Sequence, residues 1–172
     1  MYVSASFSDH LVSFCSALAE TQVLGNSLLA LATLALDEAS RPQLVSQGVC
    51  QCLVSLCGTL KDNVLNSYAA GALANLAIYE DGRSIMVQEG AISPLAQFCL
   101  RSGDNTVIGY AALALARLAV TERASLGNVV GGGNAFYALI RAQQTLGQEI
   151  APYLMQPIAD AIIALTPKPA DA

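Results

Sequence analysis

Five cysteines and one histidine are the residues of this 172-residue chain best able to bind a metal ion or act as nucleophiles. Three of the cysteines recur at a step of 42 residues beside apolar neighbours: Cys15, Cys57 and Cys99. A small thiol in such surroundings packs as a hydrophobe. Cys50 and Cys52 form a C-x-C that lacks the C-x-x-C spacing of common zinc and redox motifs, and His10 is remote in sequence. The sequence therefore predicts buried thiols, with no metal site and no cofactor.

The acidic residues could serve acid–base catalysis, but their spacing indicates a structural role. Glu38, Glu80 and Glu122 share the step of 42 residues, whereas a catalytic carboxylate would be needed only once. The chain contains no G-x-S-x-G, H-E-x-x-H or P-loop motif. The three glycines at 131–133 lie outside any predicted strand, so we do not expect a phosphate-binding loop. The sequence therefore predicts that the protein is not an enzyme.

An internal repeat explains these equal spacings. ALATLA at 30–35 becomes ALANLA at 72–77 and ALARLA at 114–119, and the glycines 48, 90 and 132 keep the same step. A fixed period near 42 is typical of helical solenoids, in which a unit buries its apolar face only by stacking on its neighbours. We therefore expect an all-α solenoid of about four three-helix repeats.

Composition limits the classes of partner. Hydrophobic residues make up 54% of the chain and charged residues only 12%, which is about half of the usual share. Two interpretations stay open: part of the surface packs against another molecule, or an alanine-rich core carries an uncharged polar surface. The net charge is −5, and the eight basic residues are scattered singly, so the chain lacks the basic cluster that nucleic acid requires.

Mean hydropathy of +0.50 makes a membrane-spanning helix worth testing. The longest runs without charge, at 42–60 and 63–79, are interrupted by Asn, Gln, Ser or Gly, and a span needs about 20 apolar residues. The first ten residues resemble neither a secretory signal nor a transit peptide. Because unpaired buried thiols favour reducing conditions, we expect an intracellular location in the cytoplasm or the interior of an organelle.

Within one period the apolar spacing predicts a short, a medium and a long helix. The predicted long helices cover 21–36, 63–78 and 104–120. The predicted short helices cover 42–47, 83–89 and 122–130, and the medium ones cover 49–60, 91–100 and 134–146, after a first helix at 11–20. Single glycines bend the chain at Gly48 and Gly90, 131–133 forms a looser bend, and Pro157 kinks or restarts the last helix. Residues 1–8 form a leader, and 166–172 form a disordered tail.

This order of helices, with VQEGAISPLAQFCLRSGDNTVIGYAALALARLA at 87–119, closely resembles the armadillo repeat. The resemblance covers Leu11 to about Ile140. It implies a right-handed α-solenoid whose long helices line a concave groove, and a role in holding peptides or partner proteins without catalysis. HEAT repeats have two helices per unit, so the short helix predicted at 83–89 separates the two. We expect one repeat domain over 9–165, divided into 9–48, 49–90, 91–132 and a degenerate last repeat at 133–165.

The resemblance also implies which residues line the groove. The family places a polar residue before the last apolar pair of each long helix, with a tryptophan four residues earlier. The polar places hold Thr33, Asn75 and Arg117. The tryptophan places hold Leu29, Gly71 and Leu113. Seven residues before the polar places stand Asn26, Tyr68 and Tyr110. Spacings of four and seven put each trio on one helix face.

Departures from the family pattern change the expected partner. Without tryptophan the chain lacks the aromatic shelves that basic nuclear-import peptides need, so we expect a partner that is not basic. Arg117 stands where the family presents a neutral amide and should favour a carboxylate or a backbone carbonyl. For Tyr68 and Tyr110 two roles stay open, a ring packed between long helices or a ring that contacts the partner.

Three functions are compatible with the sequence. The first is a non-catalytic protein-interaction scaffold, acting as a small accessory subunit of a larger assembly. The second is a free adaptor that binds extended, non-basic peptides in its groove, and the third is a membrane-associated protein. Because neither terminal helix has the polar face of a solenoid cap, we also expect another chain to cover at least one end of the stack.

Overall fold

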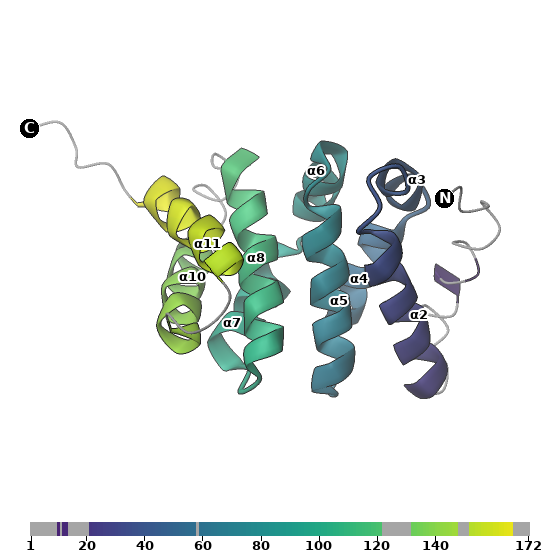
Figure 1. The fold of residues 1–172 in the computed structure, drawn as a ribbon, viewed down its shortest axis with the longest axis horizontal. Helices are drawn as coiled ribbons and strands as arrows, with labels where there is room; N and C mark the ends of the chain where they lie inside the picture. The colour runs from purple at the N-terminus through teal and green to yellow at the C-terminus, as the bar shows by residue number, and fades with distance from the viewer. Residues whose placement is uncertain are drawn as a thin grey trace, which may run out of the picture.

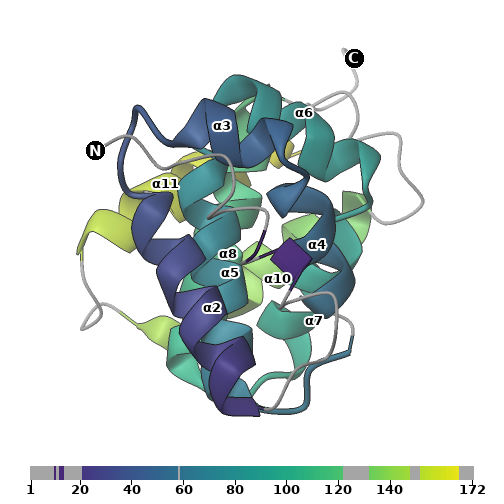
Figure 2. The ribbon, with the colours of Figure 1, turned by 90° about the vertical axis from the view of Figure 1, so that its right-hand side faces the viewer.

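The computed structural model describes residues 10, 12–13, 21–57, 59–121, 132–147 and 152–166. Over these residues the regular elements are all helices: α2 (Thr21–Leu34), α3 (Arg41–Ser46), α4 (Val49–Cys57), α5 (Asn63–Leu76), α6 (Glu80–Gln88), α7 (Ile92–Arg101), α8 (Asn105–Thr121), α10 (Gly132–Leu146) and α11 (Pro152–Leu165). Figure 1 shows α2, α5 and α8 upright and side by side in one layer, with α4, α7 and α10 behind them. The end view in Figure 2 places α3 and α6 along the top, so the unit formed by α4, α5 and α6 has a triangular cross-section.

Alanine-rich faces let the long helices pack closely. The alanines of α5, including Ala69, Ala72 and Ala74, are fully buried, as are most of those of α8. Such small side chains allow neighbouring helix axes to approach, and leucines such as Leu28 and Leu73 fill the space between the layers. Among the described helices, the contacts of α5 with α2 and α8, and of α8 with α11, are the most extensive. The core is therefore continuous along the stack.

Two arginines one period apart fix the corner between the long and the short helix. Arg41 donates from Nε and Nη2 to the carbonyls that follow α2, at 2.9 and 3.0 Å. Arg83 donates from Nη1 to the carbonyls of Ala77 and Ile78, at 3.0 and 2.9 Å. The last carbonyls of a helix have no partner within the helix, and a cation is favoured at this end. The sequence analysis missed this role, although the step of 42 residues between the arginines signalled it.

Most helices agree with the sequence expectation to within a few residues, but two details were wrong. The short helix predicted at 83–89 begins three residues earlier, because α6 starts at Glu80 and includes Gly82. A Cβ on Gly82 would lie 2.6 Å from the carbonyl oxygen of Leu76, so packing requires glycine here. The bend predicted at 131–133 was also wrong, because α10 begins at Gly132. Of the two alternatives predicted for Pro157, the restart does not occur, because Pro157 lies inside a single helix, α11.

The other expected bends are present. Gly48 and Gly90 both have φ of 77°, in the left-handed region that favours glycine, and both follow short helices. The predicted leader 1–8, the short helix 122–130 and nearly all of the tail 166–172 lie outside the described residues, and so does most of the first helix at 11–20. The repeat boundaries of the sequence analysis stay a prediction.

Candidate functional site

A cavity of about 460 Å³ opens on the face formed by the long helices α2, α5 and α8. It contains eight of the nine residues that the sequence analysis assigned to the groove. Its lining consists of Leu29, Ala32, Thr33, Leu36, Ser67, Tyr68, Gly71, Asn75, Thr106, Tyr110, Leu113 and Arg117. We call this surface the groove. Apolar side chains dominate it, and Arg117 is the one charged side chain in the lining.

Gly71 makes room for an aromatic ring from the next repeat. A Cβ on Gly71 would lie 3.6 Å from Cδ2 of Tyr110 and 3.7 Å from Cε2 of the same ring. The ring of Tyr110 thus packs on the backbone of α5, while 38% of the residue stays exposed. Tyr68 is half-buried. The two roles left open for these tyrosines are compatible, since one side of the Tyr110 ring packs on α5 and the residue still lines the groove.

The polar residues of the groove also join neighbouring repeats. Asn75 donates from Nδ2 to the carbonyl of Ala32 at 3.1 Å, and Arg117 donates from Nη1 to the carbonyl of Ala74. Each bond spans 43 residues and links one long helix to the preceding one. A guanidinium has five N–H donors, so Arg117 keeps others for a partner. Burial, with a smaller contribution from Arg41, lowers the pKa of Arg117, but an arginine stays charged near neutral pH.

Asn26 is the one predicted residue outside the groove lining. It lies on the exposed side of α2, where its Oδ1 accepts a hydrogen bond from Gln22 Nε2 at 3.3 Å. It lines a smaller hollow of about 340 Å³ that shares Leu29 and Thr33 with the groove. The sequence analysis missed Thr106, which lies one turn before Tyr110 on the same face of α8, so the same helical arithmetic would have found it.

Cysteines and acidic residues form no other chemical site in the part of the chain that the structure describes. Within these residues, no group of three or more His, Cys, Asp or Glu side chains is placed to hold a metal ion. The described cysteines Cys50, Cys52, Cys57 and Cys99 are buried, and none of them forms a disulfide. Burial raises the pKa of the thiols of Cys50, Cys57 and Cys99 from 9.0 to about 12. These thiols therefore stay protonated near neutral pH, when a thiol is a poor nucleophile.

Solved structures share this architecture. The crystal structure of an engineered protein matches with a TM-score of 0.75 at 25% sequence identity, over 92% of this chain and 62% of that one. A computationally designed armadillo repeat protein for modular peptide recognition matches with a TM-score of 0.73 at 23% identity, over 92% and 64% of the two chains. A designed armadillo repeat protein in complex with the peptide (KR)4 matches with a TM-score of 0.63 at 18% identity, over 92% and 81%.

The chain therefore has an armadillo-like repeat fold, an all-α solenoid, as the sequence resemblance indicated. It spans less than two thirds of the length of the first two of these structures. No family model and no curated protein matches the sequence. Among the described helices, none combines the length and the apolar composition that crossing a bilayer would require.

Proposed function

We propose that this protein is a non-catalytic protein-interaction scaffold that holds an extended, non-basic segment of a partner protein in the groove. The observation that carries the proposal is the cavity between α2, α5 and α8, which brings eight predicted residues from three long helices onto one surface. Two designed armadillo repeat proteins of the same fold, one for modular peptide recognition and one in complex with the peptide (KR)4, support a peptide segment as the partner.

The groove supplies affinity and selectivity through different groups. Leu29 is 46% exposed and Tyr110 38% exposed, so an apolar side chain of the partner can bury both. Arg117 contributes the one charge of the lining, which attracts a carboxylate or a backbone carbonyl and repels lysine and arginine. We infer that the preferred segment combines apolar residues with an acidic residue.

Selection from a library of displayed random peptides tests this proposal. The truncation Tyr110→Ala should weaken the binding of the selected peptides by about 2 kcal/mol, which is roughly a 30-fold loss of affinity, as expected when an aromatic hot spot is removed. Tyr137→Ala is the matched control, because Tyr137 is 65% exposed on α10 and does not line the groove. Equal binding by the wild-type protein and both variants would place the interaction outside the groove and contradict the proposal.

We further propose that the protein acts as a small accessory subunit of a larger assembly. Exposed apolar side chains on the helices at the two ends of the described stack support this role: Val23 on α2 and Ile163 on α11 are 38% and 72% exposed. Burial of such exposed apolar side chains against another chain is energetically favourable. Native mass spectrometry of material from the source distinguishes the two roles. A stoichiometric complex supports the subunit, and a monomer supports the free adaptor.

A reducing intracellular compartment completes the proposed setting. Cys50, Cys57 and Cys99 are buried and form no disulfide, which fits an environment that keeps thiols reduced. Imaging of a tagged, full-length protein tests this location, and secretion into an oxidising compartment would contradict it.

A further inference from the structure

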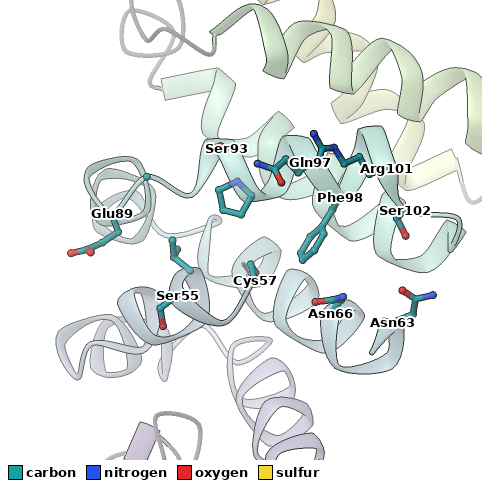
Figure 3. Close-up of a pocket in the computed structure, with 13 residues that line it drawn as sticks. Ser55, Cys57, Asn63, Asn66, Glu89, Ser93, Gln97, Phe98, Arg101 and Ser102 are labelled. Atoms are coloured by element: carbon teal, nitrogen blue, oxygen red, sulfur yellow. The ribbon is translucent and has the colours of Figure 1, made fainter. Parts of the chain in front are cut away.

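A second cavity, of about 580 Å³, lies on the other side of the stack, between α4, the start of α5 and α7. Figure 3 shows its side chains, which come from two neighbouring repeats. Neutral polar groups predominate, among them Ser55, Asn66 and Gln97. Glu89 and Arg101, at opposite ends of the view, are the two charged residues of the lining, so its formal charge sums to zero. We call this space the lateral cavity.

One repeat further along the chain, an arginine fills the corresponding place. The guanidinium of Arg141 on α10 donates to the carbonyl of Cys99 in the last turn of α7. Subtracting 42 residues turns this pair into Cys99 and Cys57. The thiol of Cys99 is too short to replace a guanidinium, and its Sγ lies 3.9 Å from the carbonyl of Ile108. Accordingly, α7 packs extensively on α10 and only slightly on α4.

The lateral cavity also holds an acceptor without a donor. Asn66 is only 7% exposed, and its Oδ1 is buried and accepts no hydrogen bond from any residue that the structure describes. Its Nδ2 makes a long bond to the carbonyl of Leu60 at 3.4 Å. A buried acceptor without a partner lowers the stability of the folded protein by about 1–3 kcal/mol. Binding of a ligand that donates a hydrogen bond to this acceptor is therefore favoured.

The shape of the lining favours a flat cation. In Figure 3 the ring of Phe98 points from α7 toward Cys57 and Asn66. A guanidinium stacks on an aromatic face, and its N–H groups then donate in the plane of the guanidinium, parallel to the ring. Cys57 is the last residue of α4, and carbonyls in the last turn of a helix lack partners within the helix and attract positive charge.

We propose that the lateral cavity binds an arginine side chain of a partner protein. The guanidinium stacks on Phe98, donates to Oδ1 of Asn66 and approaches the C-terminal end of α4, in the place that Arg141 takes one repeat later. This site is independent of the groove, which lies on the long helices and is lined by different residues.

Titration of the ¹⁵N-labelled protein with N-acetyl-arginine methylamide tests the proposal. We expect saturable shifts of the Asn66 side-chain amide and of the backbone amides at 93–102, with millimolar affinity. N-acetyl-lysine methylamide, which carries an ammonium group in place of the planar guanidinium, should bind at least fivefold more weakly. Absence of a saturable shift, or equal binding of the lysine compound, overturns the proposal.

Two variants that introduce residues of the next repeat test whether the arginine compound binds in the lateral cavity. Asn66→Ile and Phe98→Ile install the residues found 42 positions later, Ile108 and Ile140, and so suit the fold. The first should weaken the arginine compound at least tenfold and the second at least threefold, whereas Tyr137→Ala should leave the affinity unchanged. Thermal unfolding confirms that each variant is folded. Unchanged affinity in both isoleucine variants, or shifts confined to the groove, would refute the assignment.

Discussion

Replacing Arg83 by methionine should destabilise the solenoid, because this side chain closes the corner between α5 and α6. Its Nη1 donates to the carbonyls of Ala77 and Ile78 at 3.0 and 2.9 Å. A hydrogen bond from a charged group contributes about 1.5–3 kcal/mol. Arg83 is half-buried and both bonds share one nitrogen, so we expect Arg83→Met to cost about 2 kcal/mol in total. Methionine keeps an apolar stem similar to that of arginine and removes the donors together with the positive charge.

Urea denaturation followed by circular dichroism measures this loss. In a chain of this size the thermal midpoint should fall by about 4–8 °C. Lys61→Met is the control, because Lys61 is exposed and surface changes of this kind stay within about 0.5 kcal/mol. Arg41→Met should behave like Arg83→Met, since Arg41 makes the equivalent bonds one repeat earlier. If Arg83→Met were as stable as Lys61→Met, the corner bonds would not hold the repeat together.

Two further predictions concern the core. Gly82→Ala should lower the free energy of unfolding by about 1–3 kcal/mol, because the new Cβ would meet the carbonyl oxygen of Leu76 at 2.6 Å, whereas Gly103→Ala meets nothing within 4 Å and should be nearly neutral. Because burial raises the pKa of Cys57 from 9.0 to about 12, its stabilising contribution is complete below pH 9 and is lost as the pH rises toward 12. Urea midpoints at pH 7 and 10.5 should therefore differ less in Cys57→Ala than in the wild-type protein, and an equal loss in both would contradict this linkage.

Much of the fold and of the groove could be predicted from the sequence, because both follow from one period. The step of 42 residues placed equivalent residues at equivalent heights on successive long helices. Helical spacing then put Tyr68 and Asn75 on one face, as the structure confirms. Asn26 fell into the neighbouring hollow, because the groove lining on α2 begins one turn later, at Leu29.

Contacts between repeats could not be predicted in this way. A periodic pattern gives the face of a helix but not its axial offset from the next helix. Only that offset shows that Asn75 and Arg117 reach carbonyls 43 residues earlier. The role of Gly82 was missed for a similar reason, since a glycine in sequence suggests a turn, whereas here it marks the close approach of α6 to the end of α5.

The charge of the peptides that the groove selects is the most direct test of its proposed function. Peptides recovered from a random display library on the wild-type protein should be rich in apolar residues and Asp or Glu, and poor in Lys and Arg. Arg117→Gln keeps a donor for the carbonyl of Ala74 and removes the charge, so the preference for acidic residues should disappear while apolar enrichment stays. Basic peptides from the wild-type protein, or the same acidic preference in Arg117→Gln, would contradict the account.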